Sequence, residues 1–117
     1  MPRRVPKTVV KAMNADEVLN DVRISQGGRP LDYVDNVRRR IRDRKSSKLL
    51  EFSLSGLEGA ILVVCDTANL LVQLNVASIQ KIDTGLVSVQ SRYDSSLVQK
   101  KMLQISMIER RVEVGDA

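Results

Sequence analysis

The chain has 117 residues, of which 43% are hydrophobic and 3% are aromatic, with one cysteine and no histidine. Its length is typical of a single domain, and its composition predicts an aliphatic core. Without histidine or a cysteine cluster, we predict no catalytic residue, no metal site, no cofactor and no small-molecule substrate. The most apolar stretch, residues 60–76, holds several polar side chains and is too short to cross a bilayer, so no membrane span is expected. We expect the single thiol, Cys65, to be buried and reduced.

Charge is distributed unevenly along the chain. Residues 1–48 hold 13 basic and 6 acidic side chains, a net charge of +7, whereas residues 49–117 hold 6 and 8, a net charge of −2. A concentrated basic half indicates a surface that meets phosphate, either nucleic acid or acidic lipid. The alternative is a solvated charge run that serves solubility alone.

The ends of the chain differ from its centre. Residues 1–18 are basic, contain two prolines and show no clear periodicity, so we expect a flexible arm there. The folded domain is expected over residues 19–112, followed by a short tail at 113–117. The basic N-terminus lacks the apolar segment of a secretory signal, which favours a cytoplasmic location, with the nucleus as an alternative.

The first half of the domain predicts strand, helix and strand. A short strand is expected at residues 21–25, and Gly27-Gly28 then breaks it. Pro30 suits the first position of a helix, because its missing N–H costs nothing there, and the helix is expected to run to about Arg44. Its apolar stripe is Val34, Val37 and Ile41. Residues 50–55 then alternate as a half-buried strand, with Leu50, Phe52 and Leu54 on one face and Glu51, Ser53 and Ser55 on the other.

The second half predicts a helix and a long hairpin. Residues 59–75 form a helix with one narrow polar stripe and two apolar faces, although one sheet covers only one face. The second face would be an exposed patch unless another chain covers it, so we predict a dimer across this helix. The interface residues are expected to be Leu62, Val63, Leu70 and Leu74. Strands at 77–90, with an irregularity at Thr84-Gly85, and at 97–109 complete the order βαβαββ.

Two stretches of the sequence resemble the Alba family. GGRPLDYV (Gly27 to Val34) is similar to the first loop and helix start of these proteins, and LSGLEGAI (Leu54 to Ile61) to their second strand and second helix start. The resemblance implies an α/β (α+β) fold, a single βαβαββ domain like the C-terminal domain of translation initiation factor three. It also implies a homodimer, or a heterodimer with another Alba-like chain, paired partly through the second helix.

The same resemblance implies binding of RNA or DNA without enzymatic chemistry. It favours a member of the eukaryotic or protozoan type, without an Arg-Gly-Gly tail, that binds RNA in the control of mRNA stability and translation. The alternatives are an assembly subunit of a ribonucleoprotein of the ribonuclease P or MRP kind, and a chromatin-associated DNA-binding protein. Membrane association is a weaker alternative, because the stripe of the first helix is committed to a core.

The candidate nucleic-acid contacts come from three segments. Gly28 and Arg29 precede a helix N-terminus, whose free N–H groups favour phosphate. Arg39 and Arg42 lie on the arginine-rich helix and suit counterion release from a polyphosphate backbone. The hairpin supplies Arg92, Lys100 and Lys101, while Tyr33 and Tyr93 are candidates for stacking on a base. For each segment the alternative is structural, namely an ordinary turn, a solvated helix face or a soluble loop.

The sequence departs from the Alba pattern at two places. Gly28 and Arg29 replace two adjacent lysines of archaeal members, and Leu57, Glu58 and Gly59 replace a basic-glycine-basic run. An acid therefore stands where a phosphate contact is expected. This departure argues against tight coating of duplex DNA and favours RNA, or a partner subunit that supplies the missing charge.

Overall fold

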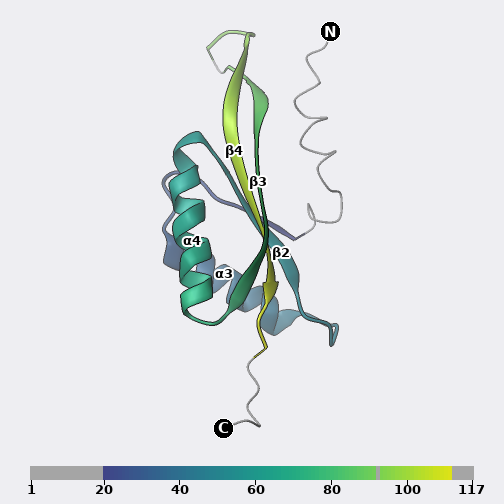
Figure 1. Ribbon diagram of the computed structural model, residues 1–117. Coiled ribbons are helices and arrows are strands. Elements are labelled where there is room, and N and C mark those ends of the chain that lie inside the picture. Colours follow the sequence, from purple (N-terminus) through teal and green to yellow (C-terminus); the bar gives the residue numbers. More distant parts are fainter. Residues whose placement is uncertain (1–19, 92, 112–117) are drawn as a thin grey trace.

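The computed structural model describes residues 20–91 and 93–111 (Figure 1). The expected arm at 1–18 and tail at 113–117 lie outside the described residues. A sheet of order β1-β2-β4-β3 carries two helices, and the predicted order βαβαββ is confirmed. The elements are β1 (Asp21–Arg23), α3 (Pro30–Asp43), β2 (Glu51–Leu57), the 3-10 turn η2 (Glu58–Ala60), α4 (Ile61–Gln73), β3 (Ala77–Gln90) and β4 (Leu97–Glu109). Their bounds agree with the predicted ones to within two residues.

The core lies between one face of the sheet and both helices. Leu54 of β2 is fully buried and pairs with Ile105 of the antiparallel β4 on one side and Val22 of the parallel β1 on the other. Because partners in register share a face, these side chains form one apolar layer. The helices cover this layer with their buried stripes, which are Val34 and Val37 on α3 and Val64, Ala68 and Leu71 on α4.

The opposite face of the sheet carries a polar network at β1. The Oγ atoms of Ser53 and Ser55 donate hydrogen bonds of 2.7 and 2.8 Å to the two carboxylate oxygens of Asp21. Ser53 was expected on the solvent face of a half-buried strand, but it is fully buried. Its hydroxyl is instead satisfied by the carboxylate of its neighbour in register, as a buried polar group requires. These bonds hold the three-residue β1 on the edge of the sheet.

Two further expectations were wrong. The ladder runs regularly through Thr84 and Gly85, and the irregularity lies between Ile79 and Lys81 instead. Cys65 is exposed, not buried. At 100° per residue it lies beside, not within, the stripe of α4 that faces the sheet. Among the described residues, no helix is long and apolar enough to span a membrane.

Candidate nucleic-acid interface

Three segments meet where β1 and β2 end. The parallel pairing continues past β1, since the Ile24 N–H donates to the Ser55 carbonyl at 2.8 Å. The first loop (residues 25–29) and the turn η2 therefore leave the sheet side by side. Gly59 lies directly against the first loop, because a Cβ on it would fall 2.5 Å from the Gln26 side chain. The amide of Lys101, on β4, completes the junction by donating to the Glu58 carboxylate.

Tyr33 fixes the conformation of the first loop. Its hydroxyl oxygen accepts a hydrogen bond from the Ser25 amide at 3.0 Å and lies 3.3 Å from the Ser25 Oγ. Its ring packs on the core and leaves no room at Gly28, where a Cβ would fall 2.0 Å from the tyrosine oxygen. Gly28 thus makes space for Tyr33, whose half-buried ring packs against the core.

Arg29 remains available to a ligand. Its Nε lies 3.4 Å from the Asp32 Oδ2, and both side chains are largely exposed. An exposed pair of this kind contributes only about 0–1 kcal/mol, so a phosphate can compete with the carboxylate. Arg29 is also the N-cap of α3 and makes no side-chain capping bond there. The positive end of the helix dipole and a forked cation therefore lie at the same point.

Glu58, at the position where the Alba pattern has glycine, forms a hydrogen bond that stabilises the base of the arm. Its φ of 44° is left-handed, a conformation that costs a residue with a side chain about 1–2 kcal/mol. The β2–β4 ladder ends at Leu57 and Met102, so the next amide of β4 lacks a strand partner there. The Glu58 carboxylate accepts from that amide, which belongs to Lys101. An acid is thereby held beside Lys101, in the turn that lies against the first loop.

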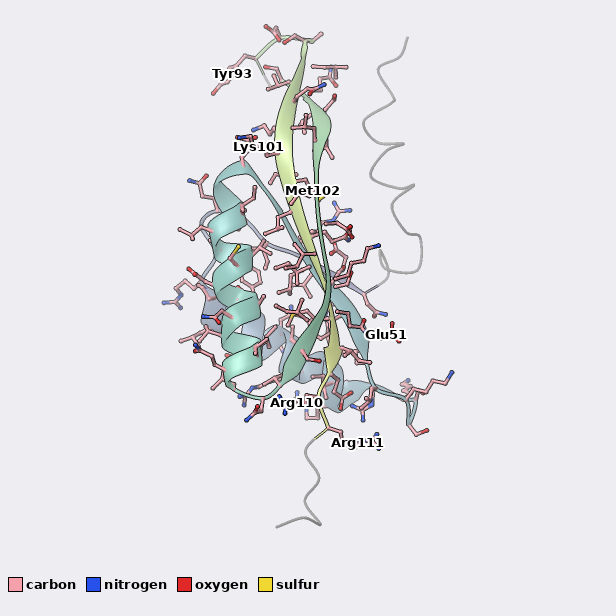
Figure 2. The ribbon with its side chains drawn as sticks, viewed as in Figure 1. Glu51, Tyr93, Lys101, Met102, Arg110 and Arg111 are labelled. Carbon is pink, nitrogen blue, oxygen red and sulfur yellow. The ribbon has the colours of Figure 1, made fainter. Side chains whose placement is uncertain are left out.

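Beyond this junction β3 and β4 continue alone as a hairpin arm (Figure 1). Five register pairs, from Leu86–Lys101 to Gln90–Leu97, extend it by about 17 Å. Successive side chains point to opposite faces, so Lys101 lies on the helix side and Lys100 on the other. Figure 2 shows Lys101 near the start of α4 and Tyr93 at the tip of the arm. The structure therefore brings Lys101, but not Lys100, to the two loops.

Hydrogen bonds join the described residues at the tip of the arm. The amide of Ser91 donates to the Ser96 carbonyl at 2.8 Å, and Asp94 accepts from the Ser96 amide and hydroxyl. These bonds, the hydroxyl first, hold the pKa of Asp94 below its ordinary value. Tyr93 is 91% exposed beside them. Arg92, the predicted contact at the tip, lies outside the described residues.

The two predicted arginines of α3 lie away from these loops. Arg39 and Arg42 are exposed and follow Pro30 by nine and twelve residues, or about 13 and 18 Å along the helix axis. The C-terminal end of α3 contacts the opposite end of the sheet, where Arg44 pairs with Glu109 at 2.7 Å. The predicted basic residues are thus divided between two ends of the molecule.

The predicted dimer residues of α4 fall into two groups. Leu62 is 67% exposed and Leu74 is also exposed, whereas Val63 and Leu70 are half-buried against the core of their own chain. The structure adds apolar residues that the sequence did not indicate, because α4 leaves part of the edge strand β3 uncovered. Ile79, Ile82 and Leu86 are exposed there. A groove of about 350 Å³ lies between Ile61 and the base of the arm, lined also by Leu86, Lys101 and Leu103.

This domain, with two helices on one face of a four-stranded mixed sheet and a long β3–β4 arm, has the fold of the Alba proteins, as the resemblance implied. It is similar to the crystal structure of ALBA1 from Trypanosoma brucei, with a TM-score of 0.60 and 21% identity over 78% of this chain and 69% of that one. It is also similar to Alba from Thermoplasma volcanium, with a TM-score of 0.61 and 12% identity over 77% of this chain and 100% of that one. At these identities the likeness shows the fold. No protein-family model and no curated protein sequence matches the chain.

Within residues 20–91 and 93–111, no three cysteine or acidic side chains are grouped so as to hold a metal ion. The exposed thiol of Cys65 has no histidine to activate it, since the sequence contains none.

Proposed function

We propose that the protein is a non-enzymatic, dimeric nucleic-acid-binding protein that binds RNA in the cytoplasm and acts on mRNA stability or translation. The observation that carries the proposal is the junction of the first loop, η2 and the base of a projecting arm. In support, the first loop, which ends in Arg29 at the N-terminus of α3, lies against η2, and η2 is hydrogen-bonded to Lys101 at the base of the arm. Such a junction offers cations and free amides to a phosphodiester backbone.

A preference for single-stranded RNA over duplex DNA follows from the charge at the junction. Arg29 and Lys101 are accompanied there by the two acids Asp32 and Glu58. A surface of balanced charge releases few counterions, so it binds a uniformly charged duplex weakly. The exposed Tyr93 at the arm tip instead suits stacking on an unpaired base.

The dimer rests on the uncovered apolar surface of α4 and β3. Leu62, Ile82 and Leu86 are each more than half exposed. In a monomer this apolar area would stay in contact with water without stabilising the fold. A second copy of this chain, or another Alba-like chain, would bury them. A heterodimeric role in a ribonucleoprotein, or in chromatin, is the second candidate function. The observation that favours it is the negative charge of Glu58 at the junction. It reduces the positive charge available for phosphate, which a partner chain would supply.

The experiment is a salt titration of binding to a 24-nucleotide single-stranded RNA and to a DNA duplex of the same sequence. We expect tighter binding to the RNA, and a salt slope that falls by about 0.7 for each phosphate contact removed in Arg29→Gln and Lys101→Gln. Binding to neither polymer at low salt would refute the proposal. Binding that appears only after a second Alba-like chain is added would favour the heterodimeric role.

A further inference from the structure

The charge of the described residues is concentrated at the end opposite the arm. Residues 38–51 and 109–111 hold nine basic and three acidic side chains, whereas the other described residues hold five basic and seven acidic ones. The sequence places the basic excess in the first half of the chain, but the fold adds Arg110 and Arg111, which directly follow β4. We call residues 38–51 and 109–111 the second basic surface (Figure 2, lower part).

Specific bonds hold the two segments of this surface together. The Arg44 Nη1 lies 2.7 Å from the Glu109 Oε1, which also accepts from the Leu50 amide at 2.9 Å. The Arg111 guanidinium donates to the Ser47 carbonyl at 3.2 Å. The loop after α3 is thereby fixed against the end of β4, and their cations form one surface.

Most acids of the second basic surface form ion pairs with arginines of the same surface. The Glu109 side chain is 8% exposed and is neutralised by Arg44, and Asp43 lies 3.4 Å from the Arg42 Nε. Lys45, Lys48 and Arg110 are exposed, and among residues 20–91 and 93–111 their side chains have no ion-pair partner. These three cations, like Arg38 and Arg39 of the same surface, are thus left free for an external anion.

This surface is separate from the candidate interface. Arg110 directly follows β4 and is nine residues from Lys101, which corresponds to about 30 Å of extended chain. That distance is about three Debye lengths at 0.1 M salt, so charges at one end do not act on a ligand at the other. The junction at the arm is nearly balanced in charge, whereas the second basic surface has a clear excess.

We infer that the second basic surface is an additional binding site for the phosphate backbone of RNA. The site is independent of base sequence, because exposed lysine and arginine side chains bind phosphates, which carry no sequence information. A stacked strand must exceed about nine nucleotides, at 3.4 Å each, to contact both ends of one chain. Shorter RNAs occupy the two sites separately, and one chain then joins two strands. The inference rests on the proposed function only for the choice of RNA as the polyanion.

The first test is lysine footprinting of the full chain. An amine-acetylating reagent is applied with and without a 24-nucleotide single-stranded RNA, and each lysine is quantified by mass spectrometry. We expect several-fold protection of Lys45 and Lys48 as well as Lys101. Lys81, which is paired with Asp83, is the unprotected control.

The outcomes separate the two sites. Protection of Lys101 alone overturns the inference and leaves the proposed function standing. Protection of Lys45 and Lys48 alone supports the inference and overturns the placement of the candidate interface. No protection at all overturns both. Protection by phosphatidylserine vesicles but not by RNA identifies a lipid surface and overturns the inference.

The second test compares two doubly neutralised variants. Lys45→Gln with Lys48→Gln is expected to lower the salt slope of RNA binding by about 1.4, or 0.7 for each cation. Arg23→Gln with Lys81→Gln removes the same charge elsewhere and is expected to leave the slope unchanged. Equal slopes for the two variants would overturn the inference. Thermal unfolding of both variants checks that a change in slope does not come from misfolding.

Discussion

The Glu58 carboxylate accepts a hydrogen bond from the backbone amide of Lys101, 43 residues further along the chain. The bond takes the place of a strand-to-strand hydrogen bond, because it satisfies the first amide of β4 beyond the end of β2. It also fixes a negative charge at the junction where RNA is proposed to bind. The Glu58 side chain therefore positions the base of the arm and also repels the phosphates of the proposed ligand.

These two effects of Glu58 can be separated with Glu58→Gln. The glutamine keeps a carbonyl oxygen for the Lys101 amide but removes the charge, so we expect tighter RNA binding with an unchanged fold. Two unit charges 4 Å apart in water interact by about 1 kcal/mol, which corresponds to roughly a fivefold gain in affinity at low salt. Asp66→Asn, an exposed acid on α4, is the control for loss of charge alone. An equal gain in both variants, measured by fluorescence anisotropy, would contradict a local role for Glu58.

Gly28 and Gly27 provide a matched pair for testing how the first loop is held. Gly28→Ala places a methyl group on the Tyr33 ring, whereas Gly27→Ala meets nothing within 4 Å. Overpacking of this kind costs about 1–3 kcal/mol, and each kcal/mol lowers the Tm of a small domain by roughly 4–8 °C. We expect the Gly28 variant alone to melt earlier when unfolding is followed by circular dichroism. If the two variants melt together, Tyr33 does not need the space at Gly28.

The sequence was most informative where periodicity alone decides burial. Val34 and Val37 on α3, and Phe52 and Leu54 on β2, are buried as predicted, because a stripe or an alternation can meet the core in only one way. The exposure of Cys65 was missed because the apolar run of α4 does not reveal which part faces the sheet.

The candidate site depended on relationships between distant segments. The sequence marks Glu58 as an unexpected acid, but its bond to Lys101 arises only once β2 ends and β4 passes it. The division of the basic residues follows from the direction of α3, which carries its arginines away from the first loop and toward Glu109. The direction in which α3 runs across the sheet cannot be predicted from the order of charges along the sequence.

The proposed dimer surface can be tested with exposed residues of similar size. Ile82 on β3 and Leu31 on α3 are 58% and 63% exposed. Burial of such a side chain contributes about 1.5–3 kcal/mol, so Ile82→Glu is expected to raise the dimer dissociation constant at least about tenfold. Leu31→Glu is expected to leave it unchanged. Sedimentation analysis that finds wild type and both variants to be monomers would contradict the proposed dimer.

The pair of Arg44 and Glu109 holds the second basic surface in place. Removing one partner of a buried ion pair costs about 3–5 kcal/mol, and we expect roughly 2 kcal/mol for Arg44→Gln because Glu109 keeps its bond to the Leu50 amide. Arg42→Gln is the control, since its pair with Asp43 is exposed and contributes at most about 1 kcal/mol. Chemical denaturation measures both free energies of unfolding. Adding Glu109→Gln to Arg44→Gln removes the unpaired charge but keeps an acceptor for Leu50, so the double variant is expected to regain part of the lost stability. A double variant less stable than Arg44→Gln alone would show that Glu109 stabilises this end of the sheet without its arginine.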